Sequence, residues 1–355
     1  MAQQATPKAV PTYTREDFQS DQLVRWCPGC GDYAILAQVQ RTLPEMGVRR
    51  ENVVFVSGIG CSSRFPYYMN TYGFHGIHGR APAIATGLKL ARPELDVWVI
   101  TGDGDGLSIG TNHTLQICRR NVNVTLLLFN NQIYGLTKGQ YSPTSPHGQR
   151  TYSSPYGNLD WPFNPIRVAL GANAAFIART IDRDQKHLAE VLLRAHEHRG
   201  TSFVEIYQNC IVFNDGAFED LVDKATRDDH VLYLEHGKPM VFGKNRDKGI
   251  RLDGLQPQVV SLSDGRWSVS DLLVHDEKEP SGALAEILAS FQERPGFPRP
   301  VGVFRDIERP IYEEEIHRLV EQASASTTDQ DLMELLEGGE TWIVKEEEEP
   351  APVQA

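Results

Sequence analysis

The sequence lacks the segments that would place it in a membrane or direct it out of the cell. It has no apolar run near the ~18 residues that a membrane-spanning helix needs, and residues 1–17 lack the hydrophobic centre of a signal peptide. Excess positive charge is also missing, because the formal net charge is −12, part of it in the run Glu346 to Glu349. We therefore expect a cytoplasmic protein that binds neither membranes nor nucleic acids.

Cysteine is scarce and odd in number, with five residues in the chain. In a chain without a secretion signal, this favours metal binding or catalysis over disulfides. Four of them stand at predicted turns or strand ends, where thiolates can converge: Cys27, Cys30, Cys61 and Cys210. One C-x-x-C knuckle with two distant single cysteines does not decide between zinc and an iron–sulfur cluster, and a redox-active pair is a weaker option. Cys118 lies on an apolar helix and is predicted to be a core residue.

The 355 residues suffice for one large or two medium domains with a sizeable core. Residues 1–20 are polar and predict an arm without a core of its own, and residues 21–210 alternate strand and helix patterns. Residues 211–280 have a looser, more charged pattern. Residues 281–355 predict a Pro-rich and acidic extension that is partly disordered, with a connector from Pro295 to Pro310.

The clearest pattern runs from Asp96 to Thr137. Val97 to Ile100 form an apolar, β-branched run typical of a buried parallel strand, and a turn with three closely spaced glycines follows it: Gly102, Gly104 and Gly106. A helix is expected from about Leu107, and Val122 to Phe129 predict a second buried strand. This stretch therefore predicts strand, turn, helix and strand in an α/β fold.

Polar groups follow both of these strands. Asp103 and Asn131 offer hard oxygen ligands, which suit a magnesium ion bound to a phosphate-bearing ligand. Open α/β sheets bind ligands at the carboxyl ends of their strands. We therefore expect a magnesium–diphosphate site at this edge of the sheet.

Other interpretations compete for the same residues. The dinucleotide-binding fingerprint fails because Leu107 occupies its third glycine position, and no phosphate-binding GK[ST] motif is found. Gly106 to Gly110 do match the G-x-S-x-G motif of serine hydrolases, with Ser108 as nucleophile. This motif is short and common by chance, so a capping or solvated serine is the simpler interpretation.

The GDG motif, the Asn pair about thirty residues later and the four cysteines together resemble the β subunits of 2-oxoacid:ferredoxin oxidoreductases, most closely the 2-oxoglutarate type. The resemblance covers roughly Leu23 to His275. It implies a parallel sheet flanked by helices, of the kind that binds the diphosphate side of thiamine diphosphate, with a C-terminal extension. It also implies oxidative decarboxylation of 2-oxoglutarate to succinyl-coenzyme A and CO₂, with electrons passed through a 4Fe–4S cluster to ferredoxin.

The resemblance assigns roles to individual residues. It implies that the 4Fe–4S cluster is held by Cys27, Cys30, Cys61 and Cys210, and that magnesium is held by Asp103, Asn131 and the carbonyl of Ile133. It also implies that thiamine diphosphate is lined by Ile59, Gly60, Cys61, Ser62, His78, Gly79, Arg80, Ala81, Gly102, Asp103, Gly104, Asp105, Asn131, Gly135 and Leu136. Without the resemblance, His78 and Arg80 read as surface-loop residues.

The family supplies the aminopyrimidine side of the cofactor from a separate α subunit, and this chain is too short to carry both modules. The resemblance therefore implies half of an active site in an α2β2 or similar hetero-oligomer. Three alternatives stay open: the same chemistry on pyruvate or another 2-oxoacid, a non-redox thiamine-diphosphate decarboxylase, and a zinc-stabilised scaffold without catalysis.

Lys138 is the predicted substrate-selecting residue. The segment from Ile133 to Thr144 leaves the magnesium site directly, so its first residues are expected near the reacting carbon. A cation there suits the second carboxylate of 2-oxoglutarate. The run LTKGQ-x-SPT also resembles the 2-oxoglutarate members of the family, although a lysine in such a loop is commonly just solvated.

Overall fold

The structure, a computed structural model, describes residues 11–325, 328–339, 342 and 344. Its helices are α1 (Asp32–Thr42), α2 (Ala81–Ala91), α3 (Thr111–Arg120), α4 (Pro165–Gly171), α5 (Gln185–Glu197), α6 (Glu219–Val222), α7 (Arg227–His230), α8 (Ala283–Ala289), α9 (Tyr312–Ser324) and α10 (Asp329–Glu337). Its strands are β1 (Val53–Ser57), β2 (Tyr72–His75), β3 (Asp96–Gly102), β4 (Val124–Asn130), β5 (Phe176–Ile181), β6 (Thr201–Tyr207), β7 (Val231–Leu234), β8 (Val241–Phe242), β9 (Lys248–Asp253), β10 (Gln256–Ser261) and β11 (Arg299–Asp306).

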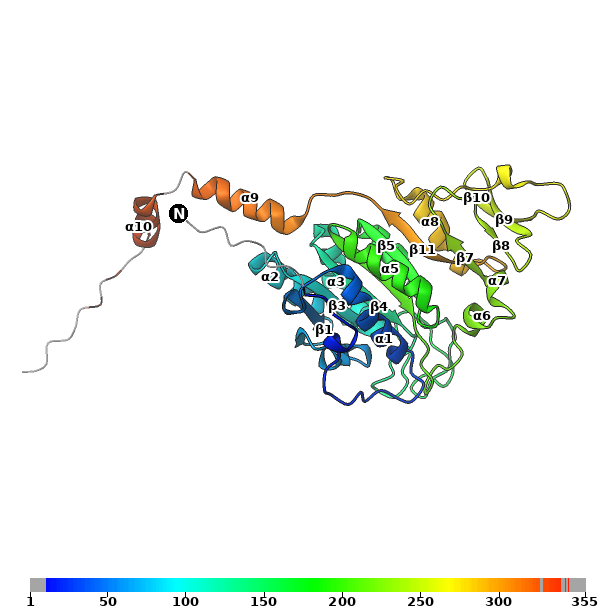
Figure 1. Cartoon of the computed structure of the whole chain (residues 1–355), viewed down its shortest axis with the longest axis horizontal. Helices are drawn as coiled ribbons and strands as arrows, with labels where there is room; N and C mark the ends of the chain where they lie inside the picture. Colours follow the sequence, from blue (N-terminus) through cyan, green and yellow to red (C-terminus); the bar gives the residue numbers. More distant parts are fainter. Residues whose placement is uncertain (1–10, 326–327, 340–341, 343, 345–355) are drawn as a thin grey trace, which may run out of the picture. The chain divides into compact units, whose positions relative to one another are not determined.

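In the described chain, eight strands form the main sheet, in the order β2-β1-β3-β4-β6-β5-β11-β7 (Figure 1). The strands from β2 to β5 in this order are parallel, and β11 runs antiparallel to β5. The central strands β1, β4 and β6 are buried along their whole length, as is typical of parallel strands covered on both faces. The carboxyl ends of β1, β3 and β4 therefore meet at one edge of the sheet.

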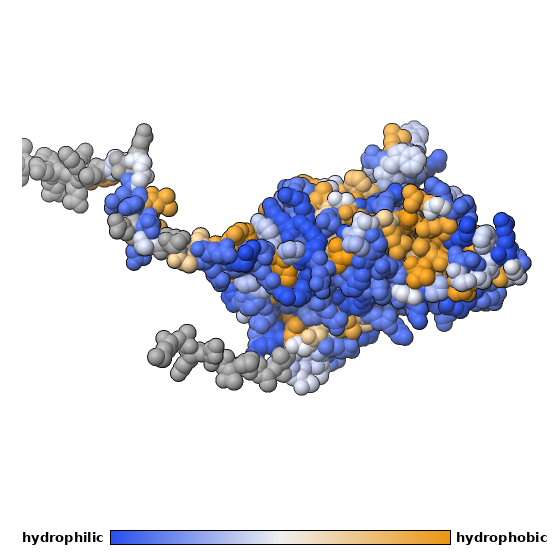
Figure 2. Space-filling view, turned by 90° about the horizontal axis from the view of Figure 1, so that it is seen from above, coloured by the Kyte–Doolittle hydropathy of each residue, from blue (hydrophilic) through white to orange (hydrophobic). Residues whose placement is uncertain are grey.

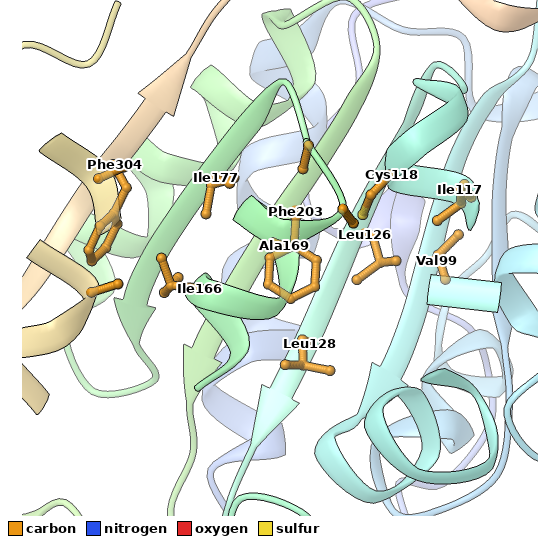
Figure 3. Packing of buried hydrophobic residues seen from close by; sticks show 14 of the residues in the cluster. Val99, Ile117, Cys118, Leu126, Leu128, Ile166, Ala169, Ile177, Phe203 and Phe304 are labelled. Atoms are coloured by element: carbon orange, nitrogen blue, oxygen red, sulfur yellow. The ribbon is translucent and has the colours of Figure 1, made fainter. Parts of the chain in front are cut away.

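Helices cover both faces of this sheet. On one face, α2, α3, α4 and α8 pack on alternate strand residues such as Val99, Leu126 and Phe203 (Figure 3). On the other face, α1 and α5 pack on the intervening residues, among them Trp98 and Leu127. Cys118 is fully buried on α3 in the first of these cores, as predicted. The predicted parallel sheet flanked by helices is confirmed.

The helix after β3 begins differently from the prediction. A π-helical turn, Asp105–Ile109, comes first, and regular α-helix starts only at Thr111, four residues after the expected Leu107. The π-helical turn ends at Gly110, whose N–H donates to the carbonyl of Asp105 at 3.1 Å. Such turns are frequent at functional sites.

The sequence misplaced the boundary near residue 281. The segment taken for a Pro-rich connector forms β11, a strand of the main sheet between β5 and β7. Pro300 lies before Gly302, the first β11 residue paired with β5, so its missing N–H costs no bond to that strand. Asp306 pairs with Arg194 of α5 at 3.2 Å and with Lys278 at 2.9 Å. Residues on both sides of the predicted boundary thus belong to one compact unit, Met1–Glu313.

The rest of the described chain forms small peripheral parts. Residues 11–20 pack on the main unit, because Phe18 is fully buried and Gln19 forms a bridge with Met69. Strands β8, β9 and β10 form a small antiparallel sheet. A second unit, Glu314–Ala355, contains most of α9 and all of α10. The acidic last residues, predicted to be disordered, lie outside the described residues.

The surface is mixed in character. Figure 2 shows hydrophilic residues over most of the visible face, with apolar residues gathered in several patches among them. None of the helices in the described ranges is both long and apolar enough to cross a bilayer.

Candidate functional site

A pocket of about 130 Å³ lies where β1, β3 and β4 end. Most of the residues predicted to line the cofactor line this pocket, namely Ile59, Gly60, Cys61, Ser62, His78, Gly102, Asp103, Gly104, Asp105, Asn131, Gly135 and Leu136. Sequence reasoning missed Phe129, Tyr134 and Thr137, and it placed Ile133 here only as a metal ligand. Typical pockets for a whole cofactor measure about 300 Å³ or more, so this one has room for only part of such a molecule.

Asp105 holds the walls of the pocket together. Its buried carboxylate accepts bonds from the N–H of Ile59 at 3.0 Å, from the N–H of Gly79 at 2.7 Å and from the hydroxyl of Thr101 at 2.7 Å. The ring Nδ1 of His78 lies 2.5 Å away and donates to the same carboxylate. A Cβ on Gly58 would come within 2.1 Å of this carboxylate, so the close approach requires glycine there. Asp105 therefore joins the loops after β1 and β2 to the end of β3.

Three residues predicted to line the cofactor stand behind the pocket wall: Gly79, Arg80 and Ala81. The guanidinium of Arg80 lies 3.3 Å from the carbonyl of His78 and 3.4 Å from that of Ile109, and donates to both. Ala81 is the first residue of α2 and is fully buried in the core. In this structure, Arg80, Ala81 and Gly79 are not among the lining residues. They hold the loop that presents His78.

Asp103 is a second buried carboxylate of the pocket, with 2% of its surface exposed. Burial raises the pKa of its carboxyl to about 6, although bonds from Ser142 and Thr144 oppose the shift. Asn131 is held by its Nδ2, which donates to Oε1 of Gln208 at 2.8 Å, while its Oδ1 accepts from the N–H of Ile133 at 3.2 Å. A buried carboxylate beside an amide oxygen and a nearby carbonyl is a hard oxygen donor set, and it fits a Mg²⁺ ion that also binds phosphate oxygens.

The four predicted cluster cysteines lie in one neighbourhood. A Cβ placed on Gly135 would be 3.6 Å from the sulfur of Cys61 and 3.6 Å from that of Cys210. Burial, and after it the charges of Asp32, Cys210 and Cys27, together raise the pKa of Cys61 to about 12. Burial likewise raises the pKa of Cys30 above its ordinary range, with a smaller effect from Cys61. The thiols are thus near enough for the charge of one to raise the pKa of another.

These thiols do not converge on one point. In the described part of the chain, no group of three or more His, Cys, Asp or Glu side chains is arranged to hold a metal ion. The four thiols match a four-thiolate site in number and lie in one neighbourhood. Those loops are partly exposed, because Cys27 is exposed and the other three are only half-buried.

Gln208 connects the thiols to the pocket, and sequence reasoning missed it. Its Nε2 lies 3.4 Å from the sulfur of Cys30, while its Oε1 accepts the bond from Asn131. It directly follows β6 (Thr201–Tyr207), at the carboxyl edge of the sheet, and the apolar residues before it were the only signal in the sequence. One buried side chain thereby links the predicted magnesium ligands to the predicted cluster ligands.

Lys138 is exposed, in a turn closed by the N–H of Tyr134, which donates to the carbonyl of Gln140 at 2.9 Å. Its backbone adopts the left-handed conformation, with φ at 72°. Its neighbour Thr137 lines the pocket, whereas Lys138 does not. Its predicted role therefore stays a prediction.

Ser108 lines a separate hollow of about 680 Å³ with Tyr134, Trp161 and seven other residues. Tyr134, whose hydroxyl donates to the carbonyl of Gly104 at 3.1 Å, is not a base able to activate a serine nucleophile. The arrangement does not support a serine hydrolase.

Comparison with known proteins identifies the class of this site. Residues 58–206, which carry the pocket, match the family model "Thiamine pyrophosphate enzyme, C-terminal TPP binding domain". The chain is 52% identical over 331 residues to 2-oxoglutarate oxidoreductase subunit KorB of Mycobacterium tuberculosis. The aligned region covers 93% of this chain and 88% of that protein. It is 47% identical over 190 residues to the β subunit of 2-oxoacid:ferredoxin oxidoreductase 1 of Aeropyrum pernix, over 54% of this chain and 60% of that protein.

A solved structure shares the fold. This is the 2-oxoglutarate:ferredoxin oxidoreductase of Magnetococcus marinus with 2-oxoglutarate, coenzyme A and succinyl-CoA bound. The two match with a TM-score of 0.73 and 32% sequence identity, over 91% of this chain and 96% of that chain.

Proposed function

We propose that this chain, which belongs to the family of 2-oxoacid:ferredoxin oxidoreductase β subunits, is the β subunit of a 2-oxoglutarate:ferredoxin oxidoreductase. In this function, 2-oxoglutarate and coenzyme A are converted to succinyl-coenzyme A and CO₂, and two electrons pass to ferredoxin. The observation that carries the proposal is the pocket at the ends of β1, β3 and β4, with both Asp103 and Asn131 among its lining residues.

The residues of the pocket have distinct tasks in this function. Thiamine diphosphate, when bound, supplies the electron sink for decarboxylation. Asp103, Asn131 and the carbonyl of Ile133 would hold magnesium on its diphosphate. Asp105 keeps the walls in place, and the apolar side chains of Phe129 and Leu136 exclude water from one side.

The thiols give the electrons a route. We assign a 4Fe–4S cluster to Cys27, Cys30, Cys61 and Cys210, beside the pocket to which Cys61 also belongs. Gln208 would then touch both a magnesium ligand, Asn131, and a cluster ligand, Cys30. A single electron leaving the pocket would have only a short distance to travel before it reached the cluster and then ferredoxin.

A second subunit must complete the site, because the pocket is too small for the whole cofactor. The loop between β4 and α4 supports this, since it exposes large apolar side chains. Tyr152 is 99% exposed, Tyr156 97% and Trp161 79%. Apolar exposure of this kind marks interaction sites. We assign this loop to contact with an α subunit that carries the aminopyrimidine side of the cofactor, in an α2β2 or similar assembly.

The purified single chain is expected not to oxidise 2-oxoglutarate, because half of the cofactor's surroundings is absent. The test is anaerobic reduction of a viologen dye with 2-oxoglutarate and coenzyme A, with the chain alone and with its α partner. Dye reduction and succinyl-coenzyme A should appear only in the mixture. Substrate-dependent turnover by the single chain would contradict the two-subunit site, and an inactive mixture would contradict the proposed reaction.

Lys138→Ala is expected to reduce kcat/KM for 2-oxoglutarate about tenfold or more beyond any effect on pyruvate. A desolvated, charge-assisted contact with a carboxylate contributes about 1.5–3 kcal/mol, and pyruvate has no second carboxylate to lose it. The measurement compares both substrates in the assembled enzyme, with Lys186→Ala on α5 as an exposed control. An equal loss of kcat/KM for both substrates would contradict the role of Lys138 in substrate selection. The substrate would then be an unspecified 2-oxoacid, the alternative that the family allows.

A further inference from the structure

The turn Ser142-Pro143-Thr144-Ser145 is buried, although it lies in a long loop of exposed residues. The turn is closed on itself, because the N–H of Ser142 donates to the hydroxyl of Ser145 at 2.8 Å and the N–H of Ser145 donates to the carbonyl of Ser142 at 3.1 Å. Buried hydroxyls that keep such well-defined partners form a rigid element.

Two hydroxyls of this turn hold the carboxylate of Asp103. Ser142 Oγ lies 2.5 Å from Oδ2 of Asp103, and Thr144 Oγ1 lies 2.6 Å from the same oxygen. Short bonds to an ionised acceptor are among the stronger hydrogen bonds in proteins. Because both hydroxyls use one oxygen, they fix the plane of the carboxylate and leave the other oxygen, Oδ1, for a ligand in the pocket.

The same turn holds the backbone around Asn131. Ser145 Oγ donates to the carbonyl of Gln132 at 2.6 Å, and Gln132 itself has a left-handed φ of 58°. Thr144 Oγ1 also lies 2.9 Å from Oδ1 of Asn130. A hydroxyl has one proton to donate, so Thr144 Oγ1 donates its hydrogen bond to the charged Asp103. Asn130 Oδ1 instead accepts a hydrogen bond from the N–H of Gln132 at 3.2 Å. The turn thus touches the residues on both sides of Asn131.

Asn130 is in turn fixed by buried charges. Its Nδ2 donates to Oε1 of Glu205 at 2.7 Å, and Oε2 of Glu205 pairs with Arg179 at 2.7 Å. Both partners of this ion pair are fully buried. The turn therefore rests against a support that extends through β4, β6 and β5, which makes its position insensitive to movement of the exposed part of the loop.

We propose that the Ser142–Ser145 turn is the positioning element that sets Asp103, Asn131 and Ile133 in the mutual geometry a divalent cation on a diphosphate requires. Its hydroxyls touch neither the cation nor the diphosphate and act through the residues that do. This inference rests on the proposed function, and it names how one loop determines the cation dependence of cofactor binding.

The test measures binding of thiamine diphosphate by calorimetry at a series of Mg²⁺ concentrations, using the full chain assembled with its α partner and freed of cofactor. Thr144→Val removes the hydroxyl at constant shape, and Thr144→Ser restores it. Thr151→Val makes the same change further along the same loop, where the hydroxyl contacts only that of Ser153 at 3.3 Å. The Mg²⁺ concentration for half-maximal binding should rise at least tenfold in Thr144→Val and stay within about twofold in the other two variants.

A purely structural role would lower the melting temperature or weaken binding equally at every Mg²⁺ concentration, and either result without a shift in the Mg²⁺ midpoint overturns the proposal. If Thr144→Val does not fold, Ser145→Ala decides in its place. That variant breaks the bond to the carbonyl of Gln132 and should shift the midpoint in the same direction, and an unchanged midpoint overturns the proposal. A wild-type complex that binds no thiamine diphosphate overturns the proposed function as well, whereas wild-type binding with an unshifted Thr144→Val overturns the positioning role alone.

Discussion

Asp103→Ala is expected to lose at least ten- to hundredfold in affinity for thiamine diphosphate in the presence of Mg²⁺. Asp103 is the only carboxylate in the predicted magnesium set, and interactions with a charged group contribute about 1.5–3 kcal/mol, more when water is excluded. Its burial makes the loss larger than at a surface site, because solvent does not take the place of the missing oxygen. Calorimetry on the assembled, cofactor-free enzyme measures the effect directly.

Asp103→Asn provides the matched control, because it keeps the size of the side chain and an oxygen that can accept from Ser142 and Thr144. It should bind with intermediate affinity, since an amide oxygen is a weaker ligand for Mg²⁺ than a carboxylate. Melting temperatures of both variants separate a binding defect from a folding defect. Wild-type affinity in Asp103→Ala would remove Asp103 from the magnesium site.

Cys61→Ser is expected to lose most of the iron of the protein, whereas Cys118→Ser should retain wild-type iron. Cys61 is the thiol that both lines the pocket and stands near the other three, so replacing it removes a ligand from the centre of the group. A cluster of four iron atoms held by four thiolates tolerates the loss of one ligand poorly. Iron, sulfide and the visible spectrum are measured on protein purified without oxygen.

Cys118 is a demanding control, because it is fully buried in the core between α3 and the sheet. Its substitution places a hydroxyl among apolar side chains and tests whether a general loss of stability releases iron. Equal iron in the two variants would refute the cysteine assignment. A colourless protein with stoichiometric zinc would instead favour a structural metal held by the same thiols.

Local apolar pattern was enough to place the central elements of this protein. The runs around Val99 and Leu126 consist mainly of apolar residues, so each of them is expected to lie between two layers of helices, and both are central strands. The position of the pocket followed from the same runs, because polar residues that follow adjacent parallel strands meet at one edge of the sheet. The motif from Gly102 to Asp105 and the Asn pair are therefore sufficient, as sequence, to mark the site.

Only the tertiary structure decided which residues support that site and where the sheet ends. Strand β11 contains Pro300, follows Pro298, and pairs with β5 and β7, which lie far back in the chain, so its local pattern predicted a connector. Gln208 and the Ser142–Ser145 turn act on partners 13 to 178 positions distant in the chain, through bonds that depend on side-chain direction. Spacing along the chain carries the period of a helix or strand, but the direction of a hydroxyl or an amide is fixed only when distant segments pack together.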